Sequence, residues 1–216
     1  MAVPEIIGSS RSTYTRAVLM VCEEKGIEYV LTEAALRAPE LRAIHPFGKM
    51  PVLRHGDVEL CESKAIASWL DSSFPGPFVF PSEPRLSALT EQWVSLVNTV
   101  VDRTLVRTYL FAYIAPGTPD GRPNQAAIAA VLPEVREQVG VLDKAVAGSG
   151  HLVGDQFTFA DINLMPILHR LQQAPEGKGA VADTRHLSAY YARHAARPSF
   201  QRTDPPPGPP RRARTE

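Results

Sequence analysis

A proline-rich segment, FPGPFVFPSEPR at residues 74–85, most constrains how this chain can fold. It holds four prolines, and neither a helix nor a central strand accommodates prolines at that density. Strand-like and helical patterns alternate before it, whereas only helical patterns follow it. The sequence therefore predicts two domains, over residues 1–76 and 85–202, joined by a linker at 77–84.

The part before the linker alternates between strand-like and helical patterns. A short apolar run occupies residues 4–7, and residues 16–26 have helical spacing that ends in a glycine, a common C-cap residue. Alternation predicts a strand within residues 27–34, then a loop, then two strands around a turn at 55–57. Helical spacing returns over residues 63–76. The order β-α-β, loop, β-β-α predicts a compact mixed α/β domain.

The part after the linker has no strand pattern. Residues 84–115 place apolar side chains on one helical face, and the helix-breaking stretch PGTPDGRPN follows at once. Three further helices are expected over residues 125–147, 157–173 and 185–196. The last residues, 203–216, are proline-rich and basic, a composition that predicts a disordered tail. The second domain is therefore predicted to be all-α.

Charge and composition exclude several classes of function. Lysine and arginine together number 23, as do aspartate and glutamate, and because these charges are interspersed we expect no surface for nucleic acid or an anionic membrane. No apolar run reaches the roughly 20 residues of a membrane helix, and the N-terminus lacks a signal-peptide pattern, so a cytoplasmic protein is expected. Cys22 and Cys61 are not spaced for a disulfide framework or a zinc site. We expect buried thiols and no metal.

One motif in the second domain has a structural explanation. The stretch FTFADINL contains Thr158 and Asp161 at the spacing of a capping box, in which each side chain bonds the backbone N–H of the other residue at a helix start. We expect Asp161 to begin its helix and not to act in catalysis.

Two features of the first domain have more than one explanation. Pro51 stands at the start of an expected strand, a position where a missing backbone donor is tolerated. Ser63 follows Glu62 at the start of a helix, where a serine can cap the helix or join the free backbone N–H groups in binding an anion. The residues alone leave capping and ligand binding open.

Three stretches stand in the order and at the spacing of a known family: SSRSTYTRAV at residues 9–18, HPFGKMPVL with CESKAIASWL between residues 45 and 70, and LVGDQFTFADINL at 152–164. Over about residues 4–202 the chain resembles the glutathione transferase superfamily, most closely the phi class and phi-like bacterial members. The resemblance implies a thioredoxin-like N-terminal domain, an all-α C-terminal domain and a detoxifying transferase. It also implies a homodimer with its interface near residues 62–105.

The resemblance further implies where glutathione, the expected co-substrate, binds. Pro51 is expected to be cis, which turns the backbone of Met50 toward the cysteinyl part of glutathione. Glu62 and Ser63 are expected to hold the γ-glutamyl end, with the serine at its carboxylate and the glutamate at its amine.

The glycyl carboxylate of glutathione needs a cation. Arg37, which matches a basic position of the phi-like pattern, and Lys49 are the candidates. Leu36 departs from that pattern, in which a polar residue usually stands. Arg37 can also be a solvated surface arginine.

The implied reaction begins with ionisation of the glutathione thiol. With a pKa of about 8.5, only about 3% is thiolate at pH 7, whereas a fall of about two units, or about 2.7 kcal/mol, makes thiolate the major form. A hydroxyl bonded to charged sulfur supplies about 1.5–3 kcal/mol, and a helix N-terminus about 0.3–1 kcal/mol. Ser12 matches the catalytic serine of the family, and Arg16 the arginine that supports the helix. Tyr14 is the alternative donor, and Ser12 can also be a plain N-cap.

The second substrate is expected between this loop and the long helix of the second domain. Ser10 and Arg11 in the loop, and Tyr109 and Tyr113 in the helix, are the candidates to contact it, although aromatic residues at such spacing are more often core. We expect electrophilic, mainly apolar small molecules as substrates, with the loop favouring polar or anionic ones.

Two other functions remain open. The same site can serve dehalogenation, isomerisation or peroxide reduction with glutathione. A protein of this fold can also bind glutathione, other ligands or partner proteins without turnover.

Overall fold

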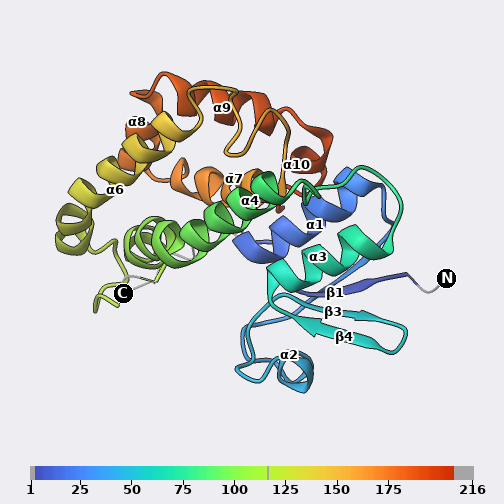
Figure 1. Cartoon of the computed structure of the whole chain (residues 1–216). Helices are drawn as coiled ribbons and strands as arrows, with labels where there is room; N and C mark the ends of the chain where they lie inside the picture. The colour runs from blue at the N-terminus through green and yellow to red at the C-terminus, as the bar shows by residue number, and fades with distance from the viewer. Residues whose placement is uncertain (1–2, 116, 207–216) are drawn as a thin grey trace.

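The computed structural model describes residues 3–115 and 117–206 (Figure 1). The first part of the chain folds into β1 (Glu5–Gly8), α1 (Thr13–Lys25), β2 (Val30–Glu33), α2 (Pro39–Ile44), β3 (Val52–His55), β4 (Val58–Cys61) and α3 (Ser63–Ser73). The second part contains α4 (Pro84–Leu96), η1 (Val97–Leu110), α5 (Phe111–Ile114), α6 (Gln125–Ala145), α7 (Phe159–Leu171), α8 (Pro175–Ala182), α9 (His186–Ala195) and α10 (Pro198–Arg202).

The first part is a thioredoxin-like domain around a mixed sheet in the order β2-β1-β3-β4. β2 runs parallel to β1, whereas β3 and β4 are antiparallel to their neighbours. Ile6 in β1 lies opposite Leu31 in β2 and Leu53 in β3, so apolar side chains share one face of the sheet. In Figure 1, α1 and α3 lie between the sheet and the helical domain. The predicted fold class is confirmed.

Helix α2 occupies part of the segment that was expected to be a loop. Its Leu41 is fully buried against Ile7 and Val52, on the sheet face opposite to α1 and α3. Pro39 stands in its first turn, where the missing N–H has no partner to lose. Six residues are too few for apolar periodicity to reveal a helix.

The second part is all-helical, as predicted. The helix expected over 84–115 is observed as the continuous series α4, η1 and α5, and the expected helices near 125–147, 157–173 and 185–196 correspond to α6, α7 and α9. The short helices α8 and α10 were not predicted. Of the predicted disordered tail, residues 207–216 lie outside the described residues.

The middle of the long helix is wound as a π-helix, whose hydrogen bonds join residues five apart. The winding brings side chains five positions apart onto one face. Arg107 Nε donates to Asp102 Oδ2 at 2.9 Å, and Thr108 Oγ1 donates to the Arg103 carbonyl at 2.9 Å. This winding sets which side chains of η1 face the first domain.

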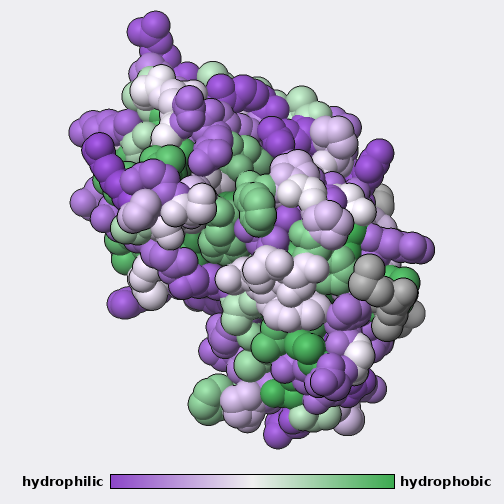
Figure 2. Space-filling model, turned by 45° about the vertical axis from the view of Figure 1, so that its right-hand side comes forward, coloured by the Kyte–Doolittle hydropathy of each residue, from purple (hydrophilic) through white to green (hydrophobic). Residues whose placement is uncertain are grey.

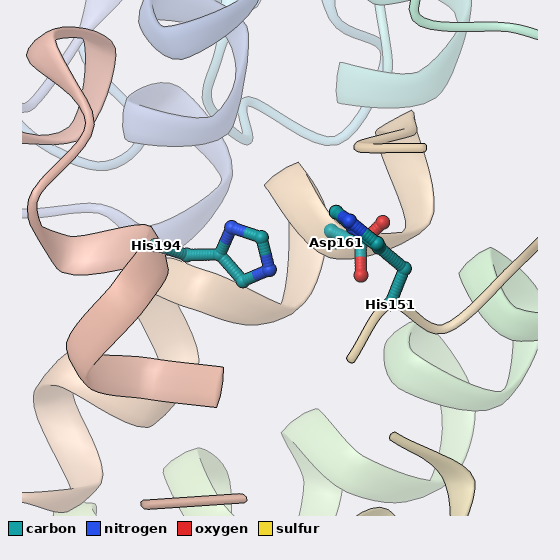
Figure 3. Close-up of side chains that lie close together, drawn as sticks. All are labelled: His151, Asp161 and His194. Carbon is teal, nitrogen blue, oxygen red and sulfur yellow. The ribbon is translucent and has the colours of Figure 1, made fainter. Parts of the chain in front are cut away.

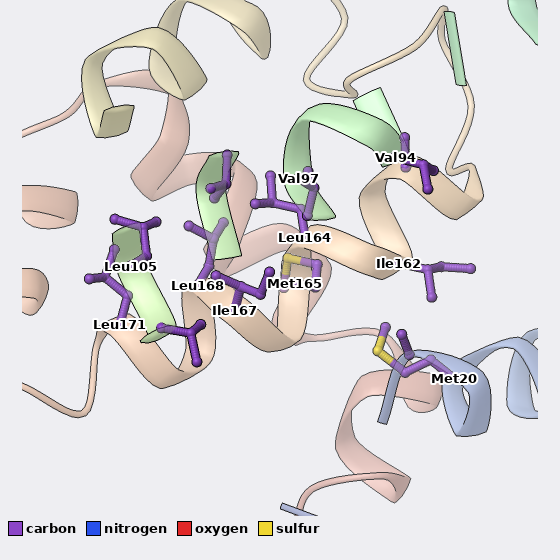
Figure 4. Close-up of a cluster of buried hydrophobic side chains, with 14 of the residues drawn as sticks. Met20, Val94, Val97, Leu105, Ile162, Leu164, Met165, Ile167, Leu168 and Leu171 are labelled. Atoms are coloured by element: carbon purple, nitrogen blue, oxygen red, sulfur yellow. The ribbon is translucent and has the colours of Figure 1, made fainter. Parts of the chain in front are cut away.

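A single apolar core joins the two domains. Helix α7 is buried along almost its whole length, and its Leu164 lies next to Val97 of η1, with Ile162 and Leu168 in the same core (Figure 4). Met20 of α1 belongs to the same core. Because apolar burial contributes about 25 cal/mol per Å² removed from water, this shared core fixes α1 against the helical domain.

The linker is held by a buried ion pair. Lys25 Nζ lies 3.1 Å from Asp71 Oδ1, and their side chains are 0% and 5% exposed. The backbone N–H groups of Val79 and Phe80 in the linker donate to the two oxygens of Asp71, at 3.0 and 3.1 Å. The pair therefore ties α1, α3 and the linker together.

The C-terminal end of the described chain returns to α1. Arg16, which is 3% exposed, donates from its Nη2 to the Phe200 carbonyl at 2.8 Å and lies 3.1 Å from Asp204 Oδ1. The guanidinium also stacks on the Phe200 ring, with its central carbon 4.0 Å from the ring centroid. The contacts of Arg16 with Phe200 and Asp204 therefore join α1 to the C-terminal end of the described chain.

Candidate active site

The site is built around the β1–α1 loop, residues 9–12. Ser12 has the extended backbone of an N-cap residue, and its Oγ accepts from the Thr15 N–H at 3.3 Å. The Ser12 N–H donates to the Ser9 carbonyl at 2.9 Å, which closes the loop as a turn. The structure therefore confirms Ser12 as an N-cap and leaves its hydroxyl proton for another acceptor.

The end of β1 approaches α1 so closely that residue 8 has to be glycine. A Cβ on Gly8 would lie 2.6 Å from Thr15 Oγ1 and 3.4 Å from Met50 Cβ. Backbone from β1, the start of α1 and the turn before β3 consequently meet at one point.

The loop is also fixed by side chains from β2 and from the turn before β3. The Ser10 N–H donates to Glu33 Oε1 at 2.9 Å, and the Ser9 N–H donates to the Met50 sulfur at 3.3 Å. The Met50–Pro51 peptide bond is cis, as predicted. The start of the β1–α1 loop, at Ser9, therefore contacts the residue that precedes the cis bond.

Glu62 and Ser63 begin α3 in a different way from the prediction. Glu62 is the N-cap residue and has a left-handed φ of 69°, whereas Ser63 is the first residue of the helix and is buried. No side chain caps this helix N-terminus among the described residues. Of the two roles left open for Ser63, capping is therefore excluded, because Glu62 makes the backbone turn and leaves the first N–H groups open.

His45 is a site residue that the sequence analysis missed. Its Nδ1 accepts from the Phe47 N–H at 3.0 Å, so its Nε2 carries the proton and lies 3.2 Å from Glu62 Oε1. His45 is 3% exposed, whereas the Glu62 side chain is 70% exposed. A buried imidazole thus orients an exposed carboxylate. The sequence feature that could have revealed His45 is its place two residues before Phe47 in the stretch HPFGKMPVL.

The two cations expected for the glycyl carboxylate lie on adjoining loops. The Arg37 N–H donates to the Gly48 carbonyl at 3.0 Å, immediately before Lys49, and both side chains are exposed. Arg37 has a left-handed φ of 66°. The structure therefore brings Arg37 and Lys49 together.

Comparisons with known proteins agree on one family. Residues 6–78 match the family model described as "Glutathione S-transferase, N-terminal domain", and residues 104–198 match "Glutathione S-transferase, C-terminal domain". The chain is similar to glutathione S-transferase 3 of Zea mays, with 30% identity over 94% of each chain. The chain belongs to the glutathione S-transferase family.

Solved structures of transferases agree with this assignment. The structure of glutathione S-transferase III in apo form has a TM-score of 0.84 and 28% identity, over 97% of this chain and all of the other. A theta class glutathione S-transferase of Xanthomonas axonopodis pv. citri, solved with glutathione bound, has a TM-score of 0.79 and 28% identity, over 94% and 97% of the two chains. The relatives include many plant phi-class transferases, the class that the sequence predicts.

In this transferase, Tyr14 faces the helical domain. Burial first, and then the negative charge of Asp102 in η1, raise the pKa of its phenol well above the ordinary value, while Arg107 opposes this shift. Asp102 is 5% exposed, and its Oδ2 accepts from Arg107. Tyr14 of the first domain therefore interacts with Asp102 of the helical domain.

The two tyrosines expected at the second substrate share a carboxylate. Tyr109 is fully buried, and its hydroxyl donates to Glu176 Oε2 at 2.9 Å and accepts from the Gly177 N–H at 2.9 Å. The Tyr113 hydroxyl also bonds Glu176, and its side chain is half-buried. The structure assigns Tyr109 to the core of the helical domain rather than to a surface that a second substrate can contact.

One group of metal-ligand residue types lies outside this site. Atoms of His151, Asp161 and His194 lie within 4.8 Å of one another (Figure 3). Both carboxylate oxygens of Asp161 are occupied, however, by the N–H groups of Leu152 and Thr158 and by the Tyr190 hydroxyl. Asp161 thus completes the predicted capping box, and a cation would have to break it.

The cysteines differ in their burial. Cys22 is fully buried in α1, and burial raises the pKa of its thiol to about 12, as expected for an inert thiol. Cys61 is half-buried in β4. The described residues contain no helix that is long and apolar enough to cross a membrane.

Proposed function

We propose that this glutathione S-transferase ionises the glutathione thiol with Ser12 and conjugates the thiolate to small electrophiles. The observation that carries the proposal is the Ser12 hydroxyl at the N-terminus of α1, in a loop whose Ser9 N–H bonds the sulfur of Met50, the residue before the cis peptide. A hydroxyl donor and a helix N-terminus both stabilise negative charge at the same point. No general base is needed, because the thiol has to lose only about two pKa units.

The proposed orientation of glutathione follows from the chemistry of its ends. Met50 offers backbone groups to the cysteinyl part, and the open N-terminus of α3 at Ser63 suits the γ-glutamyl carboxylate. Glu62, oriented by His45, suits the amine. The exposed cations Arg37 and Lys49 suit the glycyl carboxylate at the other end.

Ser12 is preferred over Tyr14 as the donor to sulfur. The phenol of Tyr14 lies near the Asp102 carboxylate, which competes for its proton, and its raised pKa makes it a weaker donor. The Ser12 hydroxyl accepts only one backbone N–H, and its proton has no protein acceptor among the described residues.

The second substrate is proposed to bind beside Ser10 and Arg11, with Tyr113 at the edge of the helical domain. Arg11 is exposed and positively charged at pH 7, which favours polar or anionic groups on an otherwise apolar electrophile. Helical and thioredoxin-like domains are proposed to divide at the linker over residues 77–84.

We also propose a cytoplasmic homodimer. Leu96 and Val100, one turn apart in the predicted interface, are 39% and 45% exposed, and Phe47 is 76% exposed. Figure 2 shows hydrophobic residues exposed among polar ones in the lower part of the molecule, which contains α2 and the sheet. Exposed apolar groups of this kind support association with a second copy.

The function can be tested by absorbance titration of the thiolate with glutathione bound. We expect the thiol pKa to fall from about 8.5 to about 6.5, and conjugation of a model electrophile to follow the same pKa. Binding of glutathione with an unchanged thiol pKa and no conjugation would instead indicate a non-catalytic member of the family.

A further inference from the structure

The peptide plane between Arg11 and Ser12 is fixed at both polar atoms. Its N–H, which belongs to Ser12, donates to the Ser9 carbonyl at 2.9 Å. Its carbonyl, which belongs to Arg11, accepts from Nη2 of Arg170 at 2.7 Å. The first bond is local to the loop, whereas the second comes from the helical domain, 159 residues away.

Arg170 is itself held in place by its own helix. It lies in the last turn of α7, whose start is secured by the capping box and whose apolar residues are buried against α1 and η1. Its Nη1 donates to Gln173 Oε1 at 2.9 Å, which orients the guanidinium. The charged groups that act on it are Arg11, which disfavours its charge, and Asp204, which favours it.

We propose that Arg170 is a positioning residue for Ser12 and thereby for the thiolate. A charge-assisted bond to the Arg11 carbonyl fixes the rotation of the peptide that carries the Ser12 nitrogen, and this sets the direction of the Ser12 side chain. The guanidinium also brings a positive charge within one peptide of Ser12. This inference rests on the proposed function and assigns the second anchor of the β1–α1 loop to the helical domain.

Arg170→Met tests the inference, because it keeps the aliphatic stem and removes the donor and the charge. We expect the thiol pKa of bound glutathione to rise by about 0.5–1 unit, and kcat/KM at pH 6.5 to fall about three- to tenfold. The dissociation constant of glutathione should change little, because the groups proposed to hold its ends are untouched. Arg170→Lys, which retains a charged donor, should restore part of the lost activity. If Arg170→Met does not fold, Arg170→Gln serves the same test.

Arg197→Met is the matched control. Arg197 also reaches α1 from the helical domain, with Nε 2.8 Å from Glu24 Oε1, but it does so near the other end of α1. We expect it to lower stability without changing the thiol pKa. An unchanged thiol pKa in Arg170→Met, or an equal rise in Arg197→Met, overturns the inference. Failure of the unaltered protein to lower the thiol pKa overturns the proposed function as well, so the two results are distinguishable.

Discussion

His45, which precedes β3 in the chain, and Glu62, which follows β4, form a hydrogen-bonded pair. The Nε2 proton of the buried imidazole points at an exposed carboxylate oxygen 3.2 Å from Nε2. The backbone N–H of Phe47 on the other ring nitrogen decides the tautomer. The carboxylate is therefore held in one direction before any ligand arrives.

His45→Ala should weaken glutathione binding by about three- to tenfold, the effect of losing one hydrogen bond to a partly solvated charge. The thiol pKa of bound glutathione should not change, because Ser12 is untouched. Binding measured by calorimetry, together with the thiolate titration, checks both statements. His45→Gln, which keeps a donor, should lie between the two proteins, and equal affinity in all three would contradict the orienting role.

Ser12→Ala should raise the thiol pKa of bound glutathione by about 1–2 units and lower kcat/KM at pH 6.5 by at least about tenfold. Loss of the N-cap should also cost about 0.5–2 kcal/mol of stability. Ser12→Gly separates the two effects, because glycine is a tolerable N-cap without a hydroxyl. Tyr14→Phe should retain the lowered thiol pKa. If Tyr14→Phe loses the thiolate and Ser12→Ala keeps it, the assignment of the donor is wrong.

Arg11→Ala should lower activity on anionic electrophiles relative to neutral ones of the same shape, by about three- to tenfold at low salt. The backbone carbonyl that Arg170 contacts remains, so the thiol pKa should change less than in Arg170→Met. Rates for a matched pair of charged and neutral substrates provide the measurement. An unchanged ratio of these rates would remove Arg11 from substrate selection.

Lys25→Met should destabilise the fold by about 3–5 kcal/mol, because it leaves the buried Asp71 carboxylate without its cation. Chemical denaturation at pH 7 gives the free energy of unfolding. The double variant Lys25→Met, Asp71→Leu should lose less than the sum of the two single variants, since neither charge is then stranded. Strict additivity would mean that the pair contributes no coupling.

Stability should fall as the pH is lowered from 7 to 5, by about 2 kcal/mol from His194 alone. Burial lowers its pKa in the folded protein to about 4, whereas the unfolded chain has an ordinary value near 6.5. Below pH 6.5 the unfolded state therefore binds the proton and the folded state does not. Unfolding measured at both pH values should show a smaller difference in His194→Gln, and an equal difference would contradict this origin.

The long helices and the four strands could be predicted from the sequence, whereas the short helices could not. Four prolines marked the segment between α3 and α4, and apolar periodicity marked α1, α4, α6 and α7. Helices α2, α8 and α10 are too short for apolar periodicity to reveal them. They depend on tertiary packing, as in the contact of Leu41 in α2 with Ile7 in the sheet. The π-helical winding of η1 was not predicted from the sequence either. In a short stretch, apolar residues spaced four apart cannot be told from apolar residues spaced five apart.

The residues proposed for the site could be chosen from the sequence where they lie in contiguous motifs. Ser12, the cis Pro51 and Glu62 stand in recognisable stretches. Arg170 was missed because it acts on the Arg11 carbonyl, and a backbone acceptor has no sequence signature across 159 positions. Ser63 was only a candidate cap of α3, and Glu62 was not considered, because its left-handed turn occurs at a non-glycine residue, for which the sequence gives little warning.

The contact of Arg16 with Phe200 and Asp204 orders events during synthesis. Strands and helices of the thioredoxin-like domain emerge first, yet the cation beneath the proposed catalytic serine receives its partners only from the last described residues. Until those residues leave the ribosome, α1 has to keep this guanidinium solvated. Final packing of α1 therefore waits for residues 200–204, even though its own sequence is complete at residue 25.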